Sequence, residues 1–290
     1  MNKNDIARSF SLAAKTYDHH AFVQQEIGHR LIERLDYIKQ TPRLILDVGS
    51  GTGHLTRILQ QKFPDSMVLG LDIAQGMAQF AKSKQSWQFW KNNPHYLCAD
   101  AESLPFANAS IDFIFSNFTL QWCANLSQTF AEFKRVLKPE GMIFFSTLGP
   151  QTLHELKSSF AAVDNKTHVN EFVDMHDIGD HLLNLRFSDP VIDMEMLTIE
   201  YPDVNTLLTD LKGTGAHNMN VDRPEGCISK HMFQRMIEAY SHFKQPNGCI
   251  PASYEIIYGH AWQQQPSHLY SEDKDGFIRI PANKIPRLEI

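Results

Sequence analysis

The feature that most constrains this chain is a regular alternation of strand-like and helix-like segments that begins at residue 44. The strand-like runs are LILDVG from residue 44, MVLGLD at 67–72, HYLCAD at 95–100, IDFIFSN at 111–117 and GMIFFSTL at 141–148. Helix-like segments stand between them, among them AQGMAQFAKSK after residue 72 and LSQTFAEFKRVL at 126–137. This alternation predicts an α/β fold with a doubly wound, Rossmann-like sheet that carries helices on both faces.

Polar residues stand at the carboxyl ends of four of these expected strands. Asp47, Asp72, Asp100 and Asn117 all lie at or just beyond a strand end. Ligands of doubly wound sheets bind at this edge, near the point where the strand order reverses. We therefore expect the functional site there.

The first strand ends in DVGSGTG, where Gly49, Gly51 and Gly53 alternate with other small residues. Such a turn lets the backbone approach a ligand and directs the N–H groups of the next helix toward negative charge. Counted from Gly51 and Gly53, the third glycine of the dinucleotide fingerprint G-x-G-x-x-G would fall at Thr56. The P-loop pattern is absent as well, because no lysine follows the glycines. Both common nucleotide classes are therefore disfavoured.

The acids that follow narrow the choice of ligand. Asp47 is suited to accept a hydrogen bond from an ammonium group, and Asp72, about 25 residues further on, suits a grip on two ribose hydroxyls. Asp100 is placed to accept from an exocyclic adenine amine, with the backbone N–H of Ala101 beside it. An amino acid, a ribose and an adenine make up S-adenosylmethionine (SAM), which we predict as the cofactor.

Residues 40–150 resemble the class I SAM-dependent methyltransferases. The resemblance is carried by LDVGSGTG, LGLD, CADAESLPF, IDFIFSNFTLQW and FKRVLKPEGMIFFSTL, which stand in that family's order. It implies that Asn117 lies beside the methyl group. It also implies that the methionine end, the ribose and the adenine of the cofactor are held, respectively, by Asp47 with Gly49 and Gly51, by Asp72, and by Asp100.

The chain outside the predicted SAM-binding core, 41–150, divides into four further parts. Residues 1–40 show apolar or small residues at helical spacing, and we expect one or two helices that act as an N-terminal lid. Residues 151–250 are expected to form an inserted, mostly helical lid or substrate subdomain, which includes the alternating run VIDMEMLTIEY. Residues 251–263 predict the final strand of the core sheet, and the tail 264–290 is expected to be loosely attached.

Beyond the core, the chain is similar to the malonyl-[acyl-carrier protein] O-methyltransferases of biotin synthesis, over about residues 10–262. The stretches that carry this are FSLAAKTYDHHAFVQ, LQWCANLS, TLGPQTLHEL, HVNEFVDMHDIGD, DLKGTGAHN and PASYEIIYGHAW. The resemblance implies methyl transfer from SAM to the free carboxylate of a malonyl thioester, on acyl carrier protein or on coenzyme A. The ester hides a charge, so that fatty-acid elongation enzymes accept the disguised primer.

A malonyl carboxylate is ionised at neutral pH, so this nucleophile needs no general base. The protein has to align the sulfonium methyl with a carboxylate oxygen in a dry pocket, which implies a lid. We expect Tyr17 and Asn117 to position the reactants, and the helix with Tyr17 and Gln24 to contact the cofactor and to close the site with the segment after Pro150. Candidate donors to the malonyl carboxylate are Asn117, Gln121, Trp122, His217, Asn218 and Arg223.

Charge and apolar patterning argue against two classes of partner. The formal net charge of −6 and a pI near 6.1 disfavour a protein that wraps nucleic acid, because phosphate binding needs a dominant basic surface. No apolar run approaches the roughly 18 residues needed to cross a bilayer, and the N-terminus lacks the apolar core of a signal peptide. We therefore expect a cytoplasmic protein without a membrane partner.

No metal site or disulfide framework is expected. The four cysteines are far apart and form no C-x-x-C pair, so we expect buried free thiols. The one tempting metal cluster is DMHDIGDH, where His176 and Asp180, or Asp177 and His181, stand four residues apart. Gly179 weakens that helix, and we expect a capped, solvated turn instead.

Two alternatives share the same core. A quinone-type small-molecule methyltransferase would need an apolar lid over its apolar substrate. The hydrophilic segments DMHDIGD and GAHNMNVDR argue mildly against this alternative. A non-catalytic, methyltransferase-like assembly factor would use the fold only as a binding module. The carrier protein that the resemblance implies is acidic, so we expect a local basic patch drawn from Lys212, Arg223, Lys230 and Arg235.

Overall fold

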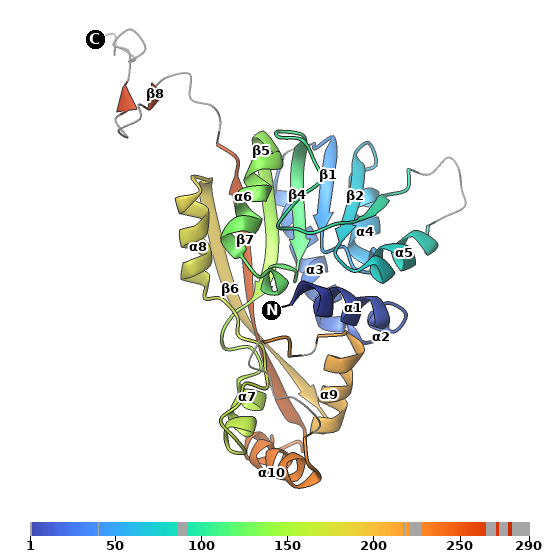
Figure 1. The fold of residues 1–290 in the computed structure, drawn as a ribbon, viewed down its shortest axis with the longest axis vertical. Helices are drawn as coiled ribbons and strands as arrows, with labels where there is room; N and C mark the ends of the chain where they lie inside the picture. Colours follow the sequence, from blue (N-terminus) through green and yellow to red (C-terminus); the bar gives the residue numbers. More distant parts are fainter. Residues whose placement is uncertain are drawn as a thin grey trace.

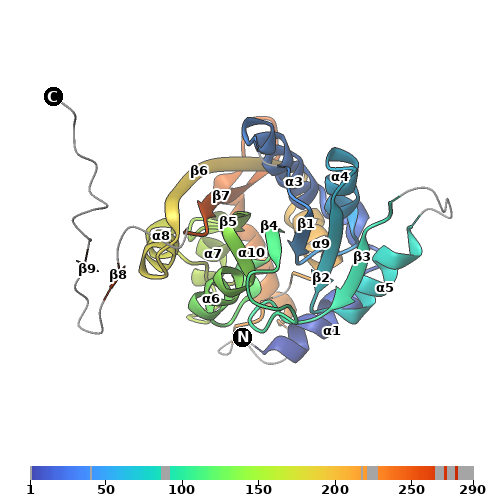
Figure 2. The same ribbon diagram turned by 90° about the horizontal axis from the view of Figure 1, so that it is seen from above.

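The chain folds around one seven-stranded sheet with helices on both faces (Figures 1 and 2). The computed structural model describes residues 2–39, 41–85, 92–216, 218–220, 228–264, 271–272 and 278–279. In chain order the strands are β1 (Leu44–Val48), β2 (Met67–Asp72), β3 (His95–Cys98), β4 (Ile111–Asn117), β5 (Leu137–Leu148), β6 (Ser188–Tyr201) and β7 (Ile250–Trp262). Two further short strands, β8 (Ser271–Glu272) and β9 (Ile278–Arg279), pair with each other.

The described helices precede, separate and follow these strands. The α-helices are α1 (Lys3–Ala13), α2 (Tyr17–His20), α3 (Phe22–Arg34), α4 (His54–Lys62), α5 (Gln75–Ser83), α6 (Leu126–Val136), α7 (His154–Ala161), α8 (Met175–Asn184), α9 (Val204–Gly213) and α10 (Lys230–Tyr240). Three 3₁₀ turns, η1 (Leu35–Tyr37), η2 (Leu120–Trp122) and η3 (Ser241–Phe243), complete them. The expected 126–137 helix ends one residue earlier, and β5 begins at Leu137 rather than at 141.

The order of strands in the sheet is β3-β2-β1-β4-β5-β7-β6. Strands β1 to β5 pair in parallel, whereas β7 runs antiparallel between β5 and β6. The order reverses between β1 and β4, so the ends of these two strands open the crevice where such sheets bind ligands. The predicted α/β, doubly wound class is confirmed.

Alternate residues along the central strands feed two separate hydrophobic cores. Ile45 and Phe144 lie in the core under α3 and α4, whereas Leu46 and Phe145 lie in the core under α6 and α8. Side chains of a strand alternate between the two faces of a sheet, and a parallel sheet covered on both faces needs apolar residues on each. This is why LILDV reads as a continuous apolar run.

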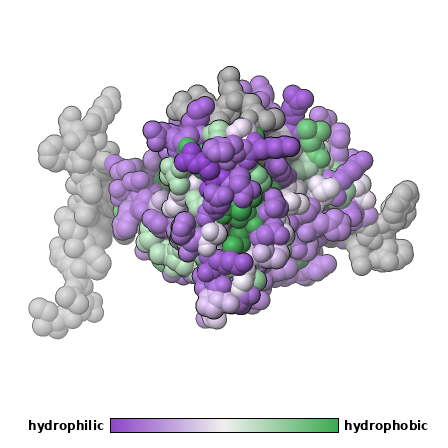
Figure 3. Space-filling view, turned by 90° about the horizontal axis from the view of Figure 1, so that it is seen from below, coloured by the Kyte–Doolittle hydropathy of each residue, from purple (hydrophilic) through white to green (hydrophobic). Residues whose placement is uncertain are grey.

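The inserted region packs around an extension of the sheet. Strand β5 pairs with β7 only from Ile256 to Trp262, whereas β6 and β7 pair on to Tyr201 and Ile250. The resulting two-stranded ribbon runs beyond the core, with α7, α9 and α10 around it (Figure 1). Seen from below, this end of the molecule shows hydrophobic surface at its centre between hydrophilic side chains (Figure 3).

The expected limits of the inserted subdomain, 151–250, need a correction. Strand β6 is part of the core sheet, and α8 packs on β6 and α6. The alternating run at 191–201 pairs with β7 along its whole length and therefore extends the sheet. The segments that stand outside the core are α7 and α10, which pack on each other, and α9, which packs on β6.

The N-terminal region consists of more than the one or two helices expected. Helix α3 belongs to the core, because its Val23, Ile27 and Leu31 are buried against the sheet. Helices α1 and α2 instead lie across the carboxyl ends of the strands (Figure 1). The part of residues 1–40 that can act as a lid is therefore confined to these two helices.

Three further expectations concern single segments. Cys98, Cys123 and Cys249 are free, but none is fully buried: Cys123 and Cys249 are partly exposed, and Cys98 is exposed because it ends the edge strand β3. Cys227 lies outside the described residues. In the DMHDIGDH segment, His176 pairs with the helix cap Asp174, and no group of three potential metal ligands occurs in the described ranges. Within those same ranges no helix is long and apolar enough to cross a membrane.

Candidate active site

The glycine turn after β1 forms the floor of the site. Gly49 and Gly51 adopt the left-handed backbone region, with φ of +76° and +54°. A Cβ atom at Gly49 would lie 1.8 Å from the Thr119 hydroxyl oxygen, so this glycine allows the turn to pack on the loop after β4. A Cβ at Gly51 would meet no atom within 4 Å, and Gly51 lines the cavity. The space beside Gly51 is open to a ligand.

Asp47 is a buried carboxylate without an ion pair among the described residues. It is 2% exposed and accepts a hydrogen bond from Thr56 Oγ1 at 2.6 Å. Burial raises the pKa of Asp47 to about 7, against the lowering effect of Thr56, and the charge of Asp72 raises it further. A bound cation would offset this cost, which fits the ammonium group expected here.

Asp72 ends β2 with both carboxylate oxygens engaged by the backbone. Its Oδ2 accepts from Gly51 N and its Oδ1 from Ala74 N, each at 2.8 Å. Burial raises the pKa of Asp72 to about 6, although these two backbone donors lower it. Each oxygen keeps a free lone pair, so the carboxylate can still accept from the two hydroxyls of a ribose.

Two buried polar atoms beside the glycine turn have no partner among the described residues. They are Gln24 Oε1 and Ser50 Oγ, and both residues line the small pocket next to Asp47 and Gly49. Buried polar atoms in folded proteins are almost always hydrogen-bonded, so the pair indicates room for a polar ligand. Together with Asp47, these atoms suit an amino-acid group, as at the methionine end of SAM.

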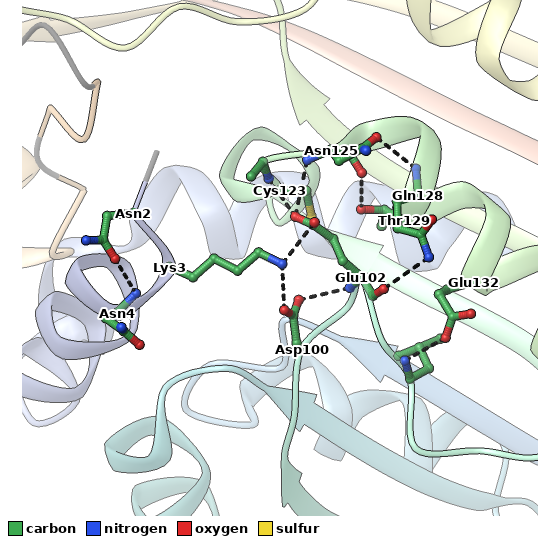
Figure 4. A network of polar contacts seen from close by, with 12 residues as sticks. Asn2, Lys3, Asn4, Asp100, Glu102, Cys123, Asn125, Gln128, Thr129 and Glu132 are labelled. Atoms are coloured by element: carbon green, nitrogen blue, oxygen red, sulfur yellow. Dashed lines mark hydrogen bonds and ion pairs between the residues drawn. The ribbon is translucent and has the colours of Figure 1, made fainter.

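Asp100 is held by a residue that sequence reasoning missed. Lys3 of α1 places its Nζ 2.6 Å from Asp100 Oδ2 and 2.9 Å from Glu102 Oε2 (Figure 4). Partial burial lowers the pKa of Lys3, but the hydrogen bonds that it donates to the two carboxylates, together with their charges, raise the pKa above its ordinary value. Asp100 and the buried Ala101 both line the cavity. The adenine amine that we expect at Asp100 would thus share that carboxylate with Lys3.

Helix α1 joins the core to the inserted region. On the core side Ser11 Oγ accepts from Gly76 N at 3.1 Å, and on the other side Ser9 Oγ donates to Gly215 O at 2.9 Å. Its Phe10 ring packs edge-on against Trp122, with centroids 5.2 Å apart. A movement of α1 away from the core would therefore expose both the carboxyl ends of the strands and the part of the cavity that faces the inserted region.

One cavity of about 520 Å³ connects the two sides. On the core side it is lined by the glycine turn and by the acids of β2 and β3. On the inserted side it is lined mainly by apolar and aromatic side chains, among them Leu153, Phe160, Phe172, Tyr201, Leu211 and Tyr254. Such a cavity can hold a nucleoside at one end and an acyl chain at the other.

The two residues expected to position the reactants both line this cavity. Asn117 Oδ1 accepts from Ser146 Oγ at 2.8 Å, and its Nδ2 donates to the backbone oxygen of Gln24 at 3.0 Å, so it fastens α3 to the end of β4. Burial, with the charges of Asp72 and Asp18, raises the pKa of the Tyr17 phenol well above its ordinary value. Tyr17 therefore stays protonated and can donate a hydrogen bond, but it cannot act as a base.

The structure brings together only part of the expected substrate set. Gln121, Trp122 and Asn218 line the cavity. Gln121 already accepts from Thr147 Oγ1 at 3.1 Å, and Asn218 donates to the backbone oxygen of Thr167. His217 and Arg223 lie outside the described residues.

Residues that sequence reasoning missed come from elements far apart in the chain. Lys3 carries no local sign of its role, because its partner Asp100 is 97 residues away. Glu102 could have been singled out from CADAESLPF: its Oε1 accepts from Ala124 N at 2.7 Å and from Asn125 N at 3.2 Å, so it fixes the loop before α6. Thr119 is recognisable only from its contact with Gly49.

Solved structures share this fold at low sequence identity. The YcgJ protein of Bacillus subtilis is 17% identical, with a TM-score of 0.58, over 82% of this chain and 99% of that one. Phosphoethanolamine N-methyltransferase 2 of Haemonchus contortus, solved with S-adenosyl-L-methionine, is 15% identical, with a TM-score of 0.54, over 88% of this chain and 57% of that one. At such identities the likeness extends to the fold alone.

Sequence relatives are much closer. Residues 46–145 match the model of a methyltransferase domain. The malonyl-[acyl-carrier protein] O-methyltransferase of Gallionella capsiferriformans is 46% identical over 271 residues, 92% of either chain. Malonyl-[acyl-carrier protein] O-methyltransferase 1 of Coxiella burnetii is 40% identical over 287 residues, 99% of this chain and 97% of that one. With its fold, its cofactor-type edge and these relatives, the chain belongs to the malonyl-[acyl-carrier protein] O-methyltransferase family.

Proposed function

We propose that this protein transfers the methyl group of SAM to the free carboxylate of a malonyl thioester carried by acyl carrier protein. The product is the methyl ester that primes pimeloyl synthesis for biotin. Close relatives over nearly the whole chain carry the name of this activity. The observation that carries the proposal in the structure is the single cavity that joins the acids of the cofactor edge to an apolar chamber in the inserted region.

The residues of the site have the roles that this reaction needs. Asp47 and Gln24 hold the amino-acid end of the cofactor, Asp72 its ribose, and Asp100 with Ala101 its adenine. SAM supplies an electrophilic methyl group when bound. Asn117 and Tyr17 keep the reactants aligned at the junction of the two halves, and α1 with α2 excludes water. No proton has to be removed, because the acceptor carboxylate is already ionised at neutral pH.

Two alternatives are less well supported. A quinone-type methyltransferase would share the core, but the relatives that match the inserted region as well are named for malonyl-[acyl-carrier protein]. A methyltransferase-like binding module would keep Asp47 as well, because Asp47 serves cofactor binding, but the relatives matched over nearly the whole chain are named as methyltransferases.

A direct assay distinguishes these functions. The protein is incubated with methyl-labelled SAM and with malonyl-acyl carrier protein, malonyl-CoA or a demethylated quinone precursor. We expect a base-labile methyl ester on the malonyl thioesters, with a preference for the carrier protein. Label in the quinone alone, or cofactor binding without any transfer, would contradict the proposal.

The carrier protein should dock on basic side chains near the inserted region. Lys230 and Arg235 lie exposed on α10, and Lys212 is exposed at the rim of the cavity, whereas Arg223 lies outside the described residues. Carrier proteins of this kind are acidic, so long-range attraction speeds their approach. Lys230 and Arg235 stand five residues apart on α10, in a chain whose formal charge is −6.

We expect the double change Lys230→Glu and Arg235→Glu to raise KM for malonyl-acyl carrier protein about tenfold at low salt. KM for malonyl-CoA should change less than about twofold, because coenzyme A does not use the docking face. Lys82→Glu, an exposed change of the same type on α5, serves as the control. An equal loss with both substrates would show that the change damages the site rather than docking.

A further inference from the structure

His20 and Asp210 form a hydrogen-bonded pair inside the cavity, and the reaction steps described above assign this pair no role. His20 belongs to α2 and Asp210 to α9, and His20 Nδ1 lies 2.8 Å from Asp210 Oδ1. Both residues line the cavity, and about a quarter of each side chain is exposed. Among the described residues the second ring nitrogen, Nε2, has no hydrogen-bond partner. Asp210 therefore fixes the Nδ1 edge of the imidazole, and Nε2 is available for a hydrogen bond to a ligand.

The ring is held at a defined place on α9. A Cβ atom at Gly213 would lie only 2.2 Å from His20 Cδ2, so only glycine leaves room for the imidazole there. Gly213 stands three residues after Asp210, on the same side of the helix. On α9, the Asp210 carboxylate and the backbone of Gly213 together hold the His20 ring in place.

His20 stands at the junction of the two halves of the cavity. It is three residues from Tyr17 on the single turn of α2, and residues at this spacing lie next to each other. Tyr17 faces the cofactor side, where it feels the charge of Asp72. Asp210 belongs to the inserted side. A group bound at His20 Nε2 would therefore lie between the cofactor edge and the acyl chamber.

The other basic side chains of the cavity are occupied or peripheral. Lys3 is bound by Asp100 and Glu102. His168 has its Nε2 on Asp164 Oδ1 at 2.9 Å and its ring stacked on Phe160. Lys212 is exposed at the rim. In the described part of the cavity, His20 is the remaining side chain that can present a cationic donor to its interior.

We propose that His20 acts as an imidazolium, which donates one N–H from Nδ1 to Asp210 and the other from Nε2 to the malonyl carboxylate, and so selects an anionic acyl group. The inference rests on the proposed function. One carboxylate oxygen is held by His20, and the other attacks the methyl carbon. A C–O bond forms as the S–CH₃ bond breaks, and its electron pair returns to sulfur, so that the sulfonium becomes a neutral thioether. No proton is transferred, which makes His20 a positioning residue rather than a base.

The test measures selectivity for the carboxylate in the absence of turnover. Binding of malonyl-CoA and of its carboxamide analogue, malonamyl-CoA, is measured by calorimetry on protein saturated with S-adenosylhomocysteine. The wild-type protein should prefer the carboxylate by about tenfold or more, because a hydrogen bond to a charged acceptor is stronger than one to a neutral amide. His20→Leu should bind both thioesters with similar affinity, and His20→Gln, a neutral donor, should fall between.

Three further variants separate this role from a merely structural one. His19→Leu changes the neighbouring, exposed histidine and should leave the preference intact. Gly213→Ala displaces the ring without altering its chemistry, and Asp210→Asn removes its orienting charge; both should reduce the preference. In methylation assays, KM for the malonyl thioester should rise much more than kcat falls, and the affinity for S-adenosylhomocysteine should stay within about twofold.

The outcomes are distinguishable. A wild-type protein that methylates malonyl thioesters, with a His20→Leu variant that keeps the full preference for the carboxylate, overturns the role of His20 and leaves the proposed function standing. A wild-type protein that neither binds nor methylates malonyl thioesters overturns both. Loss of the preference in His20→Leu but not in His19→Leu, with cofactor affinity unchanged, supports the inference.

Discussion

Replacing Gly51 with alanine is expected to weaken cofactor binding strongly while the empty protein still folds. A Cβ at this position meets no protein atom within 4 Å, and Gly51 lines the cavity together with Gly49 and Asp72. In the proposed complex the cofactor lies against the backbone of Gly51, so the side chain of an alanine there would occupy part of its space. We expect the affinity for SAM to fall by about two orders of magnitude, equivalent to about 3 kcal/mol.

The backbone cost of this change can be measured separately. Gly51 has φ of +54°, and an alanine there costs about 1 to 2 kcal/mol of folding free energy. Gly248, in the turn before β7, has φ of +87° with its nearest neighbour 4.0 Å from a Cβ, so Gly248→Ala carries similar strain far from the site. Calorimetry should show normal SAM affinity for Gly248→Ala. Matching losses of affinity in both variants would trace the effect to the fold instead.

Gly49→Ala provides the opposite contrast. Its Cβ would overlap Thr119 Oγ1, so this variant should lower the melting temperature as well as the affinity. The glycines of one turn therefore serve two purposes: Gly49 allows two loops of the protein to meet, and Gly51 keeps space for the ligand.

Asp47→Asn is expected to stabilise the empty protein and to weaken SAM binding. Asn Oδ1 can still accept the hydrogen bond from Thr56, but the buried charge is gone. We expect the free energy of unfolding at pH 8 to rise by about 1 to 3 kcal/mol, or a few degrees of melting temperature. The bound ammonium group loses its partner, and leaving one member of a buried ion pair uncompensated costs about 3 to 5 kcal/mol. The affinity for SAM should therefore fall at least about 100-fold.

The raised pKa of Asp47 makes the stability of the empty protein depend on pH. Asp47 has a folded pKa of about 7, above the 3.8 of an ordinary aspartate, so the folded protein binds the extra proton between these values. The cost of the buried charge is complete above pH 7 and shrinks as the pH falls toward 4. The empty wild-type protein should thus gain stability from Asp47 on mild acidification, and Asp47→Asn should lack that part of the gain.

Cofactor binding should show the reverse trend. In the proposed complex SAM binds the ionised forms of Asp47 and Asp72, so the affinity for SAM should rise with pH through about 6 and 7, where the two carboxylates ionise, and level off above. Asp47→Asn should remove the upper part of this dependence. Asp65→Asn, an exposed change of the same kind, is the control for melting and binding experiments. If Asp47→Asn destabilises the empty protein at pH 8, Asp47 has a structural role instead.

Local patterns were sufficient to predict the core sheet and its ligand edge. Strand β1 is apolar on both faces because helices cover both, and this gives a continuous run that is legible without knowledge of its neighbours. Asp72 and Asn117 end their strands, and parallel strands bring their carboxyl ends to one edge, so their proximity followed from the strand pattern. The glycines and acids then restricted the ligand class.

The limits of the inserted region were less accessible to such reasoning. The alternating run in β6 was recognised as distinct, but the choice between a separate subdomain and an extension of the sheet depends on β7, about 50 residues later. Edge strands and lid strands have the same alternation of exposed and buried residues, because both are covered on one face. Only the pairing of β6 with β7 decides between them.

By itself, the sequence predicted a doubly wound sheet, a strand edge at which we expect Asp47, Asp72 and Asp100 to hold the cofactor, and a family with a carboxylate as methyl acceptor. The tertiary structure decided which helices cover that edge and which side chains of the inserted region line the cavity beside it. Lys3 binds Asp100, which is 97 residues away in the sequence, and His20 pairs with Asp210, which is 190 residues away. The physical reason is that strand ends are brought together by a repeated local pattern, whereas these pairs depend on how α1, α2 and α9 dock on one another.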